Sequence, residues 1–496
     1  MIRCFIILVF CAMHSSAQVI PEVGESIGAY LDRWDAWTGQ YSERERSGAH
    51  IIAIDRVLSE WCDDDRYWSS MPPRGDADED ELADWEMTVA FIQAHPEVLE
   101  SVRDYAKLPI VGESLRASSY SFRSLNPRVT LLPVGPAPLT YSDIAPTYWS
   151  SMREHSILLR ADAYLAIVLG DDDRLLSDLR AIQGIASQCL TTRGWFDRVL
   201  VSSFVGSLKS LCLDPDIDWS GIDATTMQTI VRIMDETDRL ISPIEALATE
   251  KIIAMNTIDW FSEDSDRDRF GTIGIARLIE LRFGMFLLHR SGVWSWRDRI
   301  GCVFGAIGLR YAQQPIDRQR RFVEDYYSSL IWLCGQSPAK LESLSRPILE
   351  RRSLSTNHDI TMAFAQYVAP MDPIEFNLYY SQVLLNAAQL RMLLEVHHRM
   401  FGAYPRSIDE LRGELPKSGF RDCFSDHALR FRVINGRPLI YSLGPDRDDD
   451  QGRALLGDDG ELVRWPEFIP LDDLKAMNDA KRKAIDGDWV LYPPTE

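Results

Sequence analysis

The segment Ile157–Leu169, with the sequence ILLRADAYLAIVL, shows the apolar spacing on which the predicted fold of this chain rests. Its apolar residues recur at every third or fourth position, which is the spacing of one face of an amphipathic helix. Arg160 and Asp162 fall between them and are predicted to face away from the apolar side. The segment is therefore predicted to be an amphipathic helix.

Similar apolar stretches follow with only short breaks between them. Gly170 and three aspartates interrupt the first helix, and the pattern resumes over Leu175–Cys189 and again over Val199–Cys212. Short connections of this kind join antiparallel neighbours. The sequence thus predicts a mainly α fold with a large domain of antiparallel helical hairpins. In this arrangement Cys189 and Cys212 lie about 25 Å apart, which is too far for a disulfide between them.

Changes in composition divide the chain into five parts. They are a signal peptide (1–17), a helical N-terminal part (18–107), a Pro-rich irregular connection (108–146), the domain of helical hairpins (147–370) and a small α+β domain (374–496). Further helices are predicted over Pro243–Phe261, Arg269–His289, Trp294–Ala312, Ile316–Leu333 and Pro338–Glu350. Two prolines, at 370 and 373, mark the last boundary, because proline punctuates helical patterns.

The composition is that of a globular protein. The chain has 496 residues, of which 46% are hydrophobic and 26% charged, so it has enough apolar material for more than one domain. Its formal net charge is -21, from 53 Lys and Arg against 74 Asp and Glu. Because this excess of carboxylates would repel a phosphate backbone, no nucleic acid partner is expected.

Residues 1–17 have the features of a secretory signal. A basic residue precedes the apolar run Cys4–Met13, and small residues then allow cleavage after Ala17. The expected location is the periplasm or cell envelope of a bacterium. An uncleaved signal that acts as an anchor and a lipid on Cys11 are the two alternatives. No later apolar run reaches the length of about 18 residues that a membrane span needs, so none is expected after signal cleavage.

The C-terminal part changes from a helical to a mixed pattern. A long helix is predicted over Leu378–Met400, and two extended runs follow at Leu429–Ile434 and Pro438–Leu443. Asn435 and Gly436 join these runs, and this dipeptide is the strongest short signal for a β-hairpin. A small α+β domain is therefore predicted here.

The acidic run directly after the second extended stretch carries the clearest chemical signal. Asp446, Asp448, Asp449 and Asp450 place four carboxylates within five positions. Such groups repel one another unless water or a cation relieves them, and a hard cation with about six to eight oxygen ligands is the usual relief. Calcium is therefore the predicted cofactor, and a solvated charged turn is the alternative. An EF-hand is excluded, because the positions that need glycine and glutamate hold Gln and Gly here.

Several segments of this region share a pattern with one known family. They are Leu390–Glu395 in the long helix, Gly402–Pro405, Ser407–Leu411, Asp422–Phe424 and Tyr441–Asp446. With these segments, the part from Leu378 to Gly452 resembles the periplasmic domain of the type II secretion major pseudopilins. The whole chain is similar to large exported bacterial proteins that have a helical N-terminal part and such a module at the C-terminus.

The resemblance implies a calcium site and a link to secretion. In that family a backbone carbonyl and Asp side chains bind calcium at the last element of the domain. Carried over to this chain, it implies the Leu443 carbonyl and the Asp446 carboxylate as ligands. The further candidate ligands are Asp448, Asp449, Asp450 and Asp488.

No motif in the chain identifies a reaction, so binding or scaffolding of protein partners in the cell envelope is the expected function. The alternative is an enzyme, a helical toroid that acts on glycans through a carboxylate pair. The fourteen tryptophans would suit a sugar-binding cleft, but they fill helical cores equally well. Glu395 and His398 form one Glu-x-x-His pair, as in half of a di-iron site, but the chain has no second copy.

Overall fold

A computed structural model of the chain describes residues 22, 25, 27–61, 68–73, 78–112, 148–190, 195–238, 240, 243–261, 316–334, 371–411, 419–422, 425, 427–443, 449–453 and 488–492. The signal peptide, most of the connection at 108–146 and the helices predicted over Arg269–His289, Trp294–Ala312 and Pro338–Glu350 lie outside these residues.

The described residues are mostly helical and include one small antiparallel sheet, which confirms the predicted fold class at this level. The α-helices are α2 (Ile27–Thr38), α3 (Gly48–Trp61), α4 (Glu79–Ala94), α5 (Pro96–Tyr105), α7 (Trp149–Leu169), α8 (Asp172–Cys189), α9 (Trp195–Leu213), α10 (Ala224–Asp238), α11 (Pro243–Phe261), α14 (Ile316–Cys334) and α16 (Met371–Phe401). Short 3-10 helices are η1 (Glu43–Glu45) and η7 (Ile408–Leu411). The sheet order is β1-β2-β3, with β1 (Arg430–Ile434), β2 (Arg437–Ser442) and β3 (Trp489–Tyr492). Among the described helices, none combines the length and the apolar character that crossing a membrane requires.

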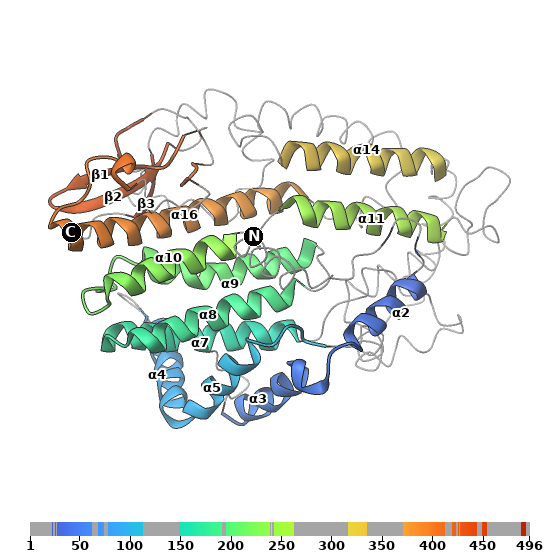
Figure 1. Ribbon diagram of the computed structural model, residues 1–496, viewed down its shortest axis with the longest axis horizontal. Helices are drawn as coiled ribbons and strands as arrows, with labels where there is room; N and C mark the ends of the chain where they lie inside the picture. The colour runs from blue at the N-terminus through green and yellow to red at the C-terminus, as the bar shows by residue number, and fades with distance from the viewer. Residues whose placement is uncertain are drawn as a thin grey trace, which may run out of the picture.

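The helices stack in layers, as Figure 1 shows. Helices α7 and α8 pack against each other in the middle of the stack, with α9 and α10 on one side and α3, α4 and α5 on the other. The long helix α16 lies across α9 and α10, while α11 packs against α9 and α14. The sheet covers α16 on the side away from α9 and α10 (Figure 1). Helix α16 therefore connects the helical stack to the sheet.

The tight turn between α7 and α8 depends on Gly170 and Asp171. Gly170 adopts a left-handed conformation, with φ of 66°, that ends the helix and that glycine reaches without a steric penalty. The Asp171 side chain then accepts a hydrogen bond of 3.1 Å from the backbone N–H of Arg174 and caps α8. The break predicted at this position is confirmed, and the two helices form an antiparallel hairpin.

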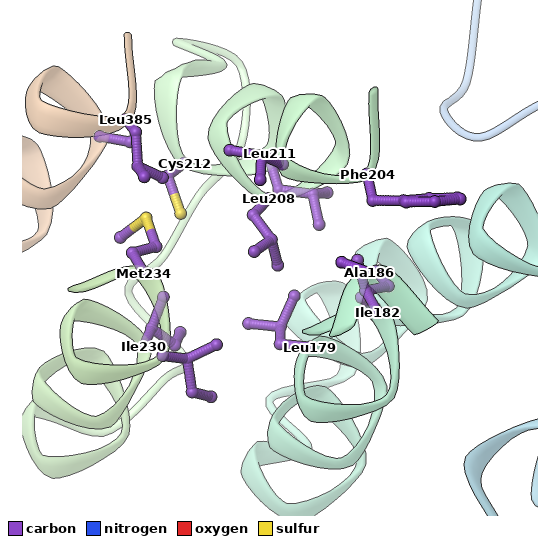
Figure 2. Close-up of a cluster of buried hydrophobic side chains, with 14 of the residues drawn as sticks. Leu179, Ile182, Ala186, Phe204, Leu208, Leu211, Cys212, Ile230, Met234 and Leu385 are labelled. Atoms are coloured by element: carbon purple, nitrogen blue, oxygen red, sulfur yellow. The ribbon is translucent and has the colours of Figure 1, made fainter. Parts of the chain in front are cut away.

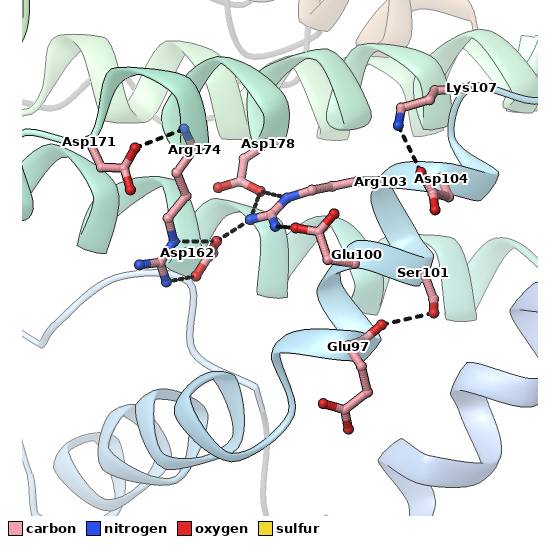
Figure 3. Close-up of polar contacts among 10 residues, drawn as sticks. All are labelled: Glu97, Glu100, Ser101, Arg103, Asp104, Lys107, Asp162, Asp171, Arg174 and Asp178. Carbon is pink, nitrogen blue, oxygen red and sulfur yellow. Dashed lines mark hydrogen bonds and ion pairs between the residues drawn. The ribbon is translucent and has the colours of Figure 1, made fainter.

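The prediction that Asp162 faces away from the core is wrong. Because α7 is covered by α8 and α9 and also by α3, α4 and α5, its polar face is enclosed, and Asp162 is fully buried. Its carboxylate accepts hydrogen bonds from Arg103 on α5 (2.5 Å) and from Nε of Arg174 on α8 (2.9 Å), as Figure 3 shows. Val168 and Leu169, predicted for the apolar face, are 64% and 69% exposed at the end of the helix.

An apolar core fills the space between α8, α9, α10 and α16. Figure 2 shows Leu179 and Ile182 of α8 facing Leu208 of α9, with side chains of α10 and α16 beside them. The residues predicted for the apolar face of α8 are buried at Leu175, Leu179, Ile182, Ile185, Ala186 and Cys189, and half-buried at Leu176. No disulfide joins Cys189 to Cys212, as predicted, although both side chains are buried in this core.

Replacing glycine by alanine should have opposite effects on the free energy of unfolding at two positions in helix interiors. A Cβ on Gly184 of α8 would overlap the carbonyl oxygen of Ala106 at the end of α5, whereas a Cβ on Gly206 of α9 would meet only Lys209 Cε at 3.8 Å. We expect Gly184→Ala to lower the free energy of unfolding by about 1–3 kcal/mol, because α5 and α8 must separate. Gly206→Ala should raise it by about 0.5–1 kcal/mol, because alanine has the higher helix propensity.

Urea unfolding followed by tryptophan fluorescence measures both effects in the full chain. The two variants carry the same substitution in neighbouring helices, so a difference in sign reports the backbone contact alone. Stabilisation by Gly184→Ala would show that α8 and α5 do not approach each other at this point.

The C-terminal hairpin is confirmed, and one strand was missed. Strands β1 and β2 pair from Ile434 and Arg437 outward, and Asn435 and Gly436 both have positive φ, as a type I′ turn requires. The third strand, β3, pairs with β2 and was not predicted from the sequence. The boundary proposed between 370 and 374 falls at the start of α16, which packs on α9 and α10 as well as on β2 and β3.

Candidate functional site

The acidic loop after β2 lies against the start of β3. Gly452 donates its N–H to Asp488 Oδ2 (2.6 Å), and Asp488 donates its own N–H to the carbonyl of Arg453 (2.8 Å). These bonds bring Asp488 close to Asp449 and Asp450, although 36 residues separate Gly452 from Asp488. Burial, followed by the charges of these two neighbours, raises the pKa of Asp488 to about 6. The three carboxylates thus interact electrostatically.

Two carboxylate oxygens, Asp450 Oδ2 in this loop and Asp488 Oδ1 at the start of β3, are buried without a hydrogen-bond partner among the described residues. The other Asp450 oxygen accepts from Arg453 Nη2 (2.6 Å), and Asp449 Oδ1 accepts from the Tyr441 hydroxyl (3.1 Å). A buried anionic oxygen without a donor is costly, and a cation would relieve that cost. The two oxygens therefore fit calcium, which takes carboxylate and carbonyl ligands.

The predicted ligands are only partly placed by the structure. Asp449, Asp450 and Asp488 lie near one another. Asp446 and Asp448 fall in 444–448, outside the described residues. Leu443 has a buried side chain, and its N–H donates to Asp422 Oδ2 (3.2 Å). Within the described ranges, no group of three or more His, Cys, Asp or Glu side chains has the arrangement of a metal site. A calcium site would therefore need ligands beyond those described.

Asp422 holds the end of β2, where the acidic loop begins. The side chain is buried and accepts hydrogen bonds from Ser442 Oγ (2.5 Å) and from the N–H of Leu443 (3.2 Å). Its own N–H donates to the carbonyl of His427 (2.9 Å). These contacts fix the position from which the loop starts. No motif in the sequence predicted this role for Asp422.

A second candidate site is a cleft of ≈ 620 Å³ between the connection that follows α9 and the C-terminal half of α16. The connection contributes residues 215–220, and the sheet contributes Tyr492 of β3 among others. Its walls carry arginines, carboxylates and aromatic rings together. The cleft lies where the helical stack meets the sheet, so residues distant in the sequence converge on it.

One face of α16 forms a wall of this cleft. Arg391, Glu395, His398 and Arg399 are spaced by four, three and one residues, which places them on the same side of a helix. The Tyr404 hydroxyl donates to Glu395 Oε2 (3.3 Å), and the Tyr404 ring stacks on His398 with 4.4 Å between ring centroids. The Glu-x-x-His pair noted in the sequence thus lies in the cleft, in contact with a tyrosine.

Arg391 is the most buried charge of the cleft. Its Nη1 donates to the carbonyls of Cys212 and Asp214, the latter at 2.8 Å, and its guanidinium carbon lies 4.2 Å from the centre of the Tyr492 ring. Burial lowers the pKa of Arg391, and the nearby tyrosine, cysteine and carboxyl groups oppose this shift. The side chain joins α16 to the helical stack and to β3.

Glu395 and His398 were noted from the sequence, whereas Arg391 and Arg399 on the same face were not. Helical spacing shows that Arg391 and Arg399 share a side with Glu395, but it does not show that residues 215–220 lie opposite. Comparisons of the chain with protein-family models, curated proteins and solved structures found no match. The two sites are therefore interpreted from their own chemistry.

Proposed function

We propose that this protein is an exported binding or scaffolding protein of the bacterial cell envelope, with a C-terminal pseudopilin-like module stabilised by calcium. The division into a large helical domain (147–370) and a small α+β domain (374–496) belongs to this proposal. The signal-like residues 1–17 support export, and the pseudopilin-like segments support a link to secretion and to protein partners in the envelope. The observation that carries the calcium proposal is the pair of unpartnered buried oxygens on Asp450 and Asp488.

Calcium would stabilise the module by joining the acidic loop to the last strand. Because Asp488 directly precedes β3, a cation bound there fastens β3, which in turn pairs with β2 and contacts α16. Binding at this point would therefore stabilise the whole sheet. The residues that would hold the cation are Asp450 and Asp488, with the Leu443 carbonyl, Asp446, Asp448 and Asp449 as further candidates.

We expect calcium to raise the unfolding temperature of the full chain. A dissociation constant of about 10–100 µM would give about 1.4–2.7 kcal/mol of stabilisation at about 1 mM calcium. Magnesium should give much less, because it demands tight octahedral coordination and loses its water reluctantly. Scanning calorimetry in calcium, in magnesium and in chelator measures the difference.

Asp488→Asn tests the proposed ligand set with little disturbance, because the amide oxygen can still accept the Gly452 N–H. The variant should lose most of the calcium-dependent shift, while its unfolding temperature in chelator should stay the same or rise as repulsion by Asp449 and Asp450 is relieved. Asp173→Asn removes the same charge from the exposed start of α8 and should keep the full shift. If calcium does not raise the unfolding temperature of the native chain, or raises that of Asp488→Asn equally, the calcium proposal fails. The acidic loop would then be interpreted as a solvated charged turn.

Among the described residues, the glycan-enzyme alternative can be assessed at the cleft beside α16. Its carboxylates already have partners, because Glu395 accepts from Tyr404 and Asp218 accepts from the N–H and hydroxyl of Ser220 (2.9 Å each). The ring of Trp219 is buried, so it offers no exposed face on which a sugar ring could stack. These contacts favour binding over hydrolysis. Glycan cleavage that disappears in Glu395→Gln would reverse this preference.

A further inference from the structure

Two residues that line the cleft between residues 215–220 and α16 each carry an N–H group with no acceptor among the described residues. These groups are Arg391 Nε and Trp219 Nε1, and both side chains are only 3% exposed. A buried donor that has lost water and gained no protein acceptor destabilises the protein in that state. The wall therefore lacks acceptor oxygens at two neighbouring elements, the connection after α9 and the helix α16.

The same wall carries two arginines. Carboxyl groups lie near them, Glu395 and Asp214 near Arg391 and Asp218 near Arg399. Among the described residues, neither Arg391 nor Arg399 forms an ion pair. Both guanidinium groups donate to backbone carbonyls, at the end of α9 and in the connection that follows it. The chain as a whole has a net charge of -21 and an excess of carboxylates. Planar guanidinium groups match the oxygens of carboxylates and phosphates, so the missing component has the chemistry of an oxyanion.

Other groups in the cleft suit hydroxyl groups and a ring. Glu395 and Asp218 offer carboxylate oxygens, and the rings of Tyr404 and Tyr492 line the same space. Carboxylates accept hydrogen bonds from sugar hydroxyls, and aromatic rings pack on the apolar faces of sugars. A volume of ≈ 620 Å³ lies in the range of small-molecule sites.

We propose that the cleft binds a small acidic sugar, whose carboxylate or phosphate group is held by Arg391 and Trp219 and whose hydroxyl groups meet Glu395 and Asp218. The anion would supply acceptors to both buried N–H groups and a counter-charge to the guanidinium groups. The proposal is independent of calcium, because none of the described residues of the acidic loop lines the cleft.

Calorimetric titration of the full chain in chelator tests the ligand class. The probes are glucuronate, which carries a carboxylate, and glucose 6-phosphate, which carries a phosphate. Glucose is the control without an anionic group, and inorganic phosphate is the control without a sugar. We expect one or both acidic sugars to bind at least about tenfold more tightly than glucose, since hydrogen bonds to a charged group are the stronger ones. The better acidic sugar identifies the anion. The proposal is overturned if neither acidic sugar binds, or if glucose binds equally well. If inorganic phosphate binds as tightly as the acidic sugar, the cleft is an anion site that does not recognise the sugar.

Variants then test the two donors. Arg391→Lys keeps the charge but loses Nε and the planar fork, and Trp219→Phe keeps an aromatic ring but loses the indole N–H. Each should weaken binding of the better acidic sugar, Arg391→Lys by about tenfold. Arg232→Lys on the exposed side of α10 is the matched control and should change nothing. Circular dichroism confirms folding, and full affinity in both folded cleft variants would contradict the assignment.

Discussion

Replacing Arg103 by methionine should lower the free energy of unfolding by about 3–5 kcal/mol at neutral pH, because it removes the cation of a buried ion network. Arg103 of α5 is 7% exposed and bonds to two other helices (Figure 3). It donates Nε to Asp178 Oδ1 on α8 (2.8 Å) and Nη2 to Asp162 Oδ2 on α7 (2.5 Å). Its Nη1 also binds Glu100 on its own helix (2.5 Å).

The penalty should fall mainly on Asp178. Asp162 keeps Arg174 as a partner when Arg103 is lost, whereas no other described cation contacts Asp178. Burial, then the charge of Asp162, already raises the pKa of Asp178 well above its usual range, and Arg103 opposes this shift by its charge and its hydrogen bond. Loss of Arg103 would therefore leave Asp178 either as an unpaired buried anion or as a protonated acid.

The pH dependence of the effect follows from this pKa shift. A carboxyl group whose pKa is raised by folding destabilises the folded state above the unfolded-state pKa of about 4, and the penalty disappears below it. The deficit of Arg103→Met should therefore shrink as the pH falls from about 7 towards about 4. The double variant Arg103→Met/Asp178→Leu should recover most of the lost stability, because an apolar pair of similar volume replaces a buried ion pair at little cost.

Lys107→Met is the matched control for Arg103→Met. Lys107 lies just after the same helix and pairs with Asp104 (2.7 Å), but both side chains are about 70% exposed. Exposed ion pairs contribute little, so the change should stay within about 0.5 kcal/mol. Urea unfolding of all four proteins provides the comparison. Equal effects of Arg103→Met and Lys107→Met would show that the network is open to water.

Local rules predicted most elements, since they depend on neighbouring residues. Gly170 ends α7 in a left-handed conformation, and Asn435 and Gly436 take the positive φ values of a hairpin turn. The prediction that Asp162 faces away from the core was wrong because its surroundings depend on residues distant in the sequence. Periodicity assigns a polar residue to solvent unless a partner is known, and Arg103 is 59 residues away. Helix α7 is also covered on more than one side, which its own sequence does not reveal.

The candidate sites were predictable to different degrees for the same reason. The acidic loop could be found because four of its five residues from 446 to 450 are carboxylates. Asp488 was predicted only through the resemblance to a known family. Strand β3 has only four residues and depends on pairing with β2, so no local signal required it. The cleft needs residues 215–220 beside Arg391, and that pairing arises only when α16 packs on α9 and α10.

The packing of those helices can be tested at Leu208, which is 1% exposed and lies in the core between α8 and α9 (Figure 2). Leu208→Ala should lower the free energy of unfolding by about 2–5 kcal/mol, because it removes buried methyl groups and leaves a cavity. Leu169→Ala removes the same atoms from a side chain that is 69% exposed, and should stay within about 0.5 kcal/mol. Since both changes are Leu→Ala in helices, the difference in unfolding free energy measures burial alone. A difference below about 1 kcal/mol would mean that α8, α9 and α10 do not enclose Leu208, and the cleft that depends on their packing against α16 would lose its support.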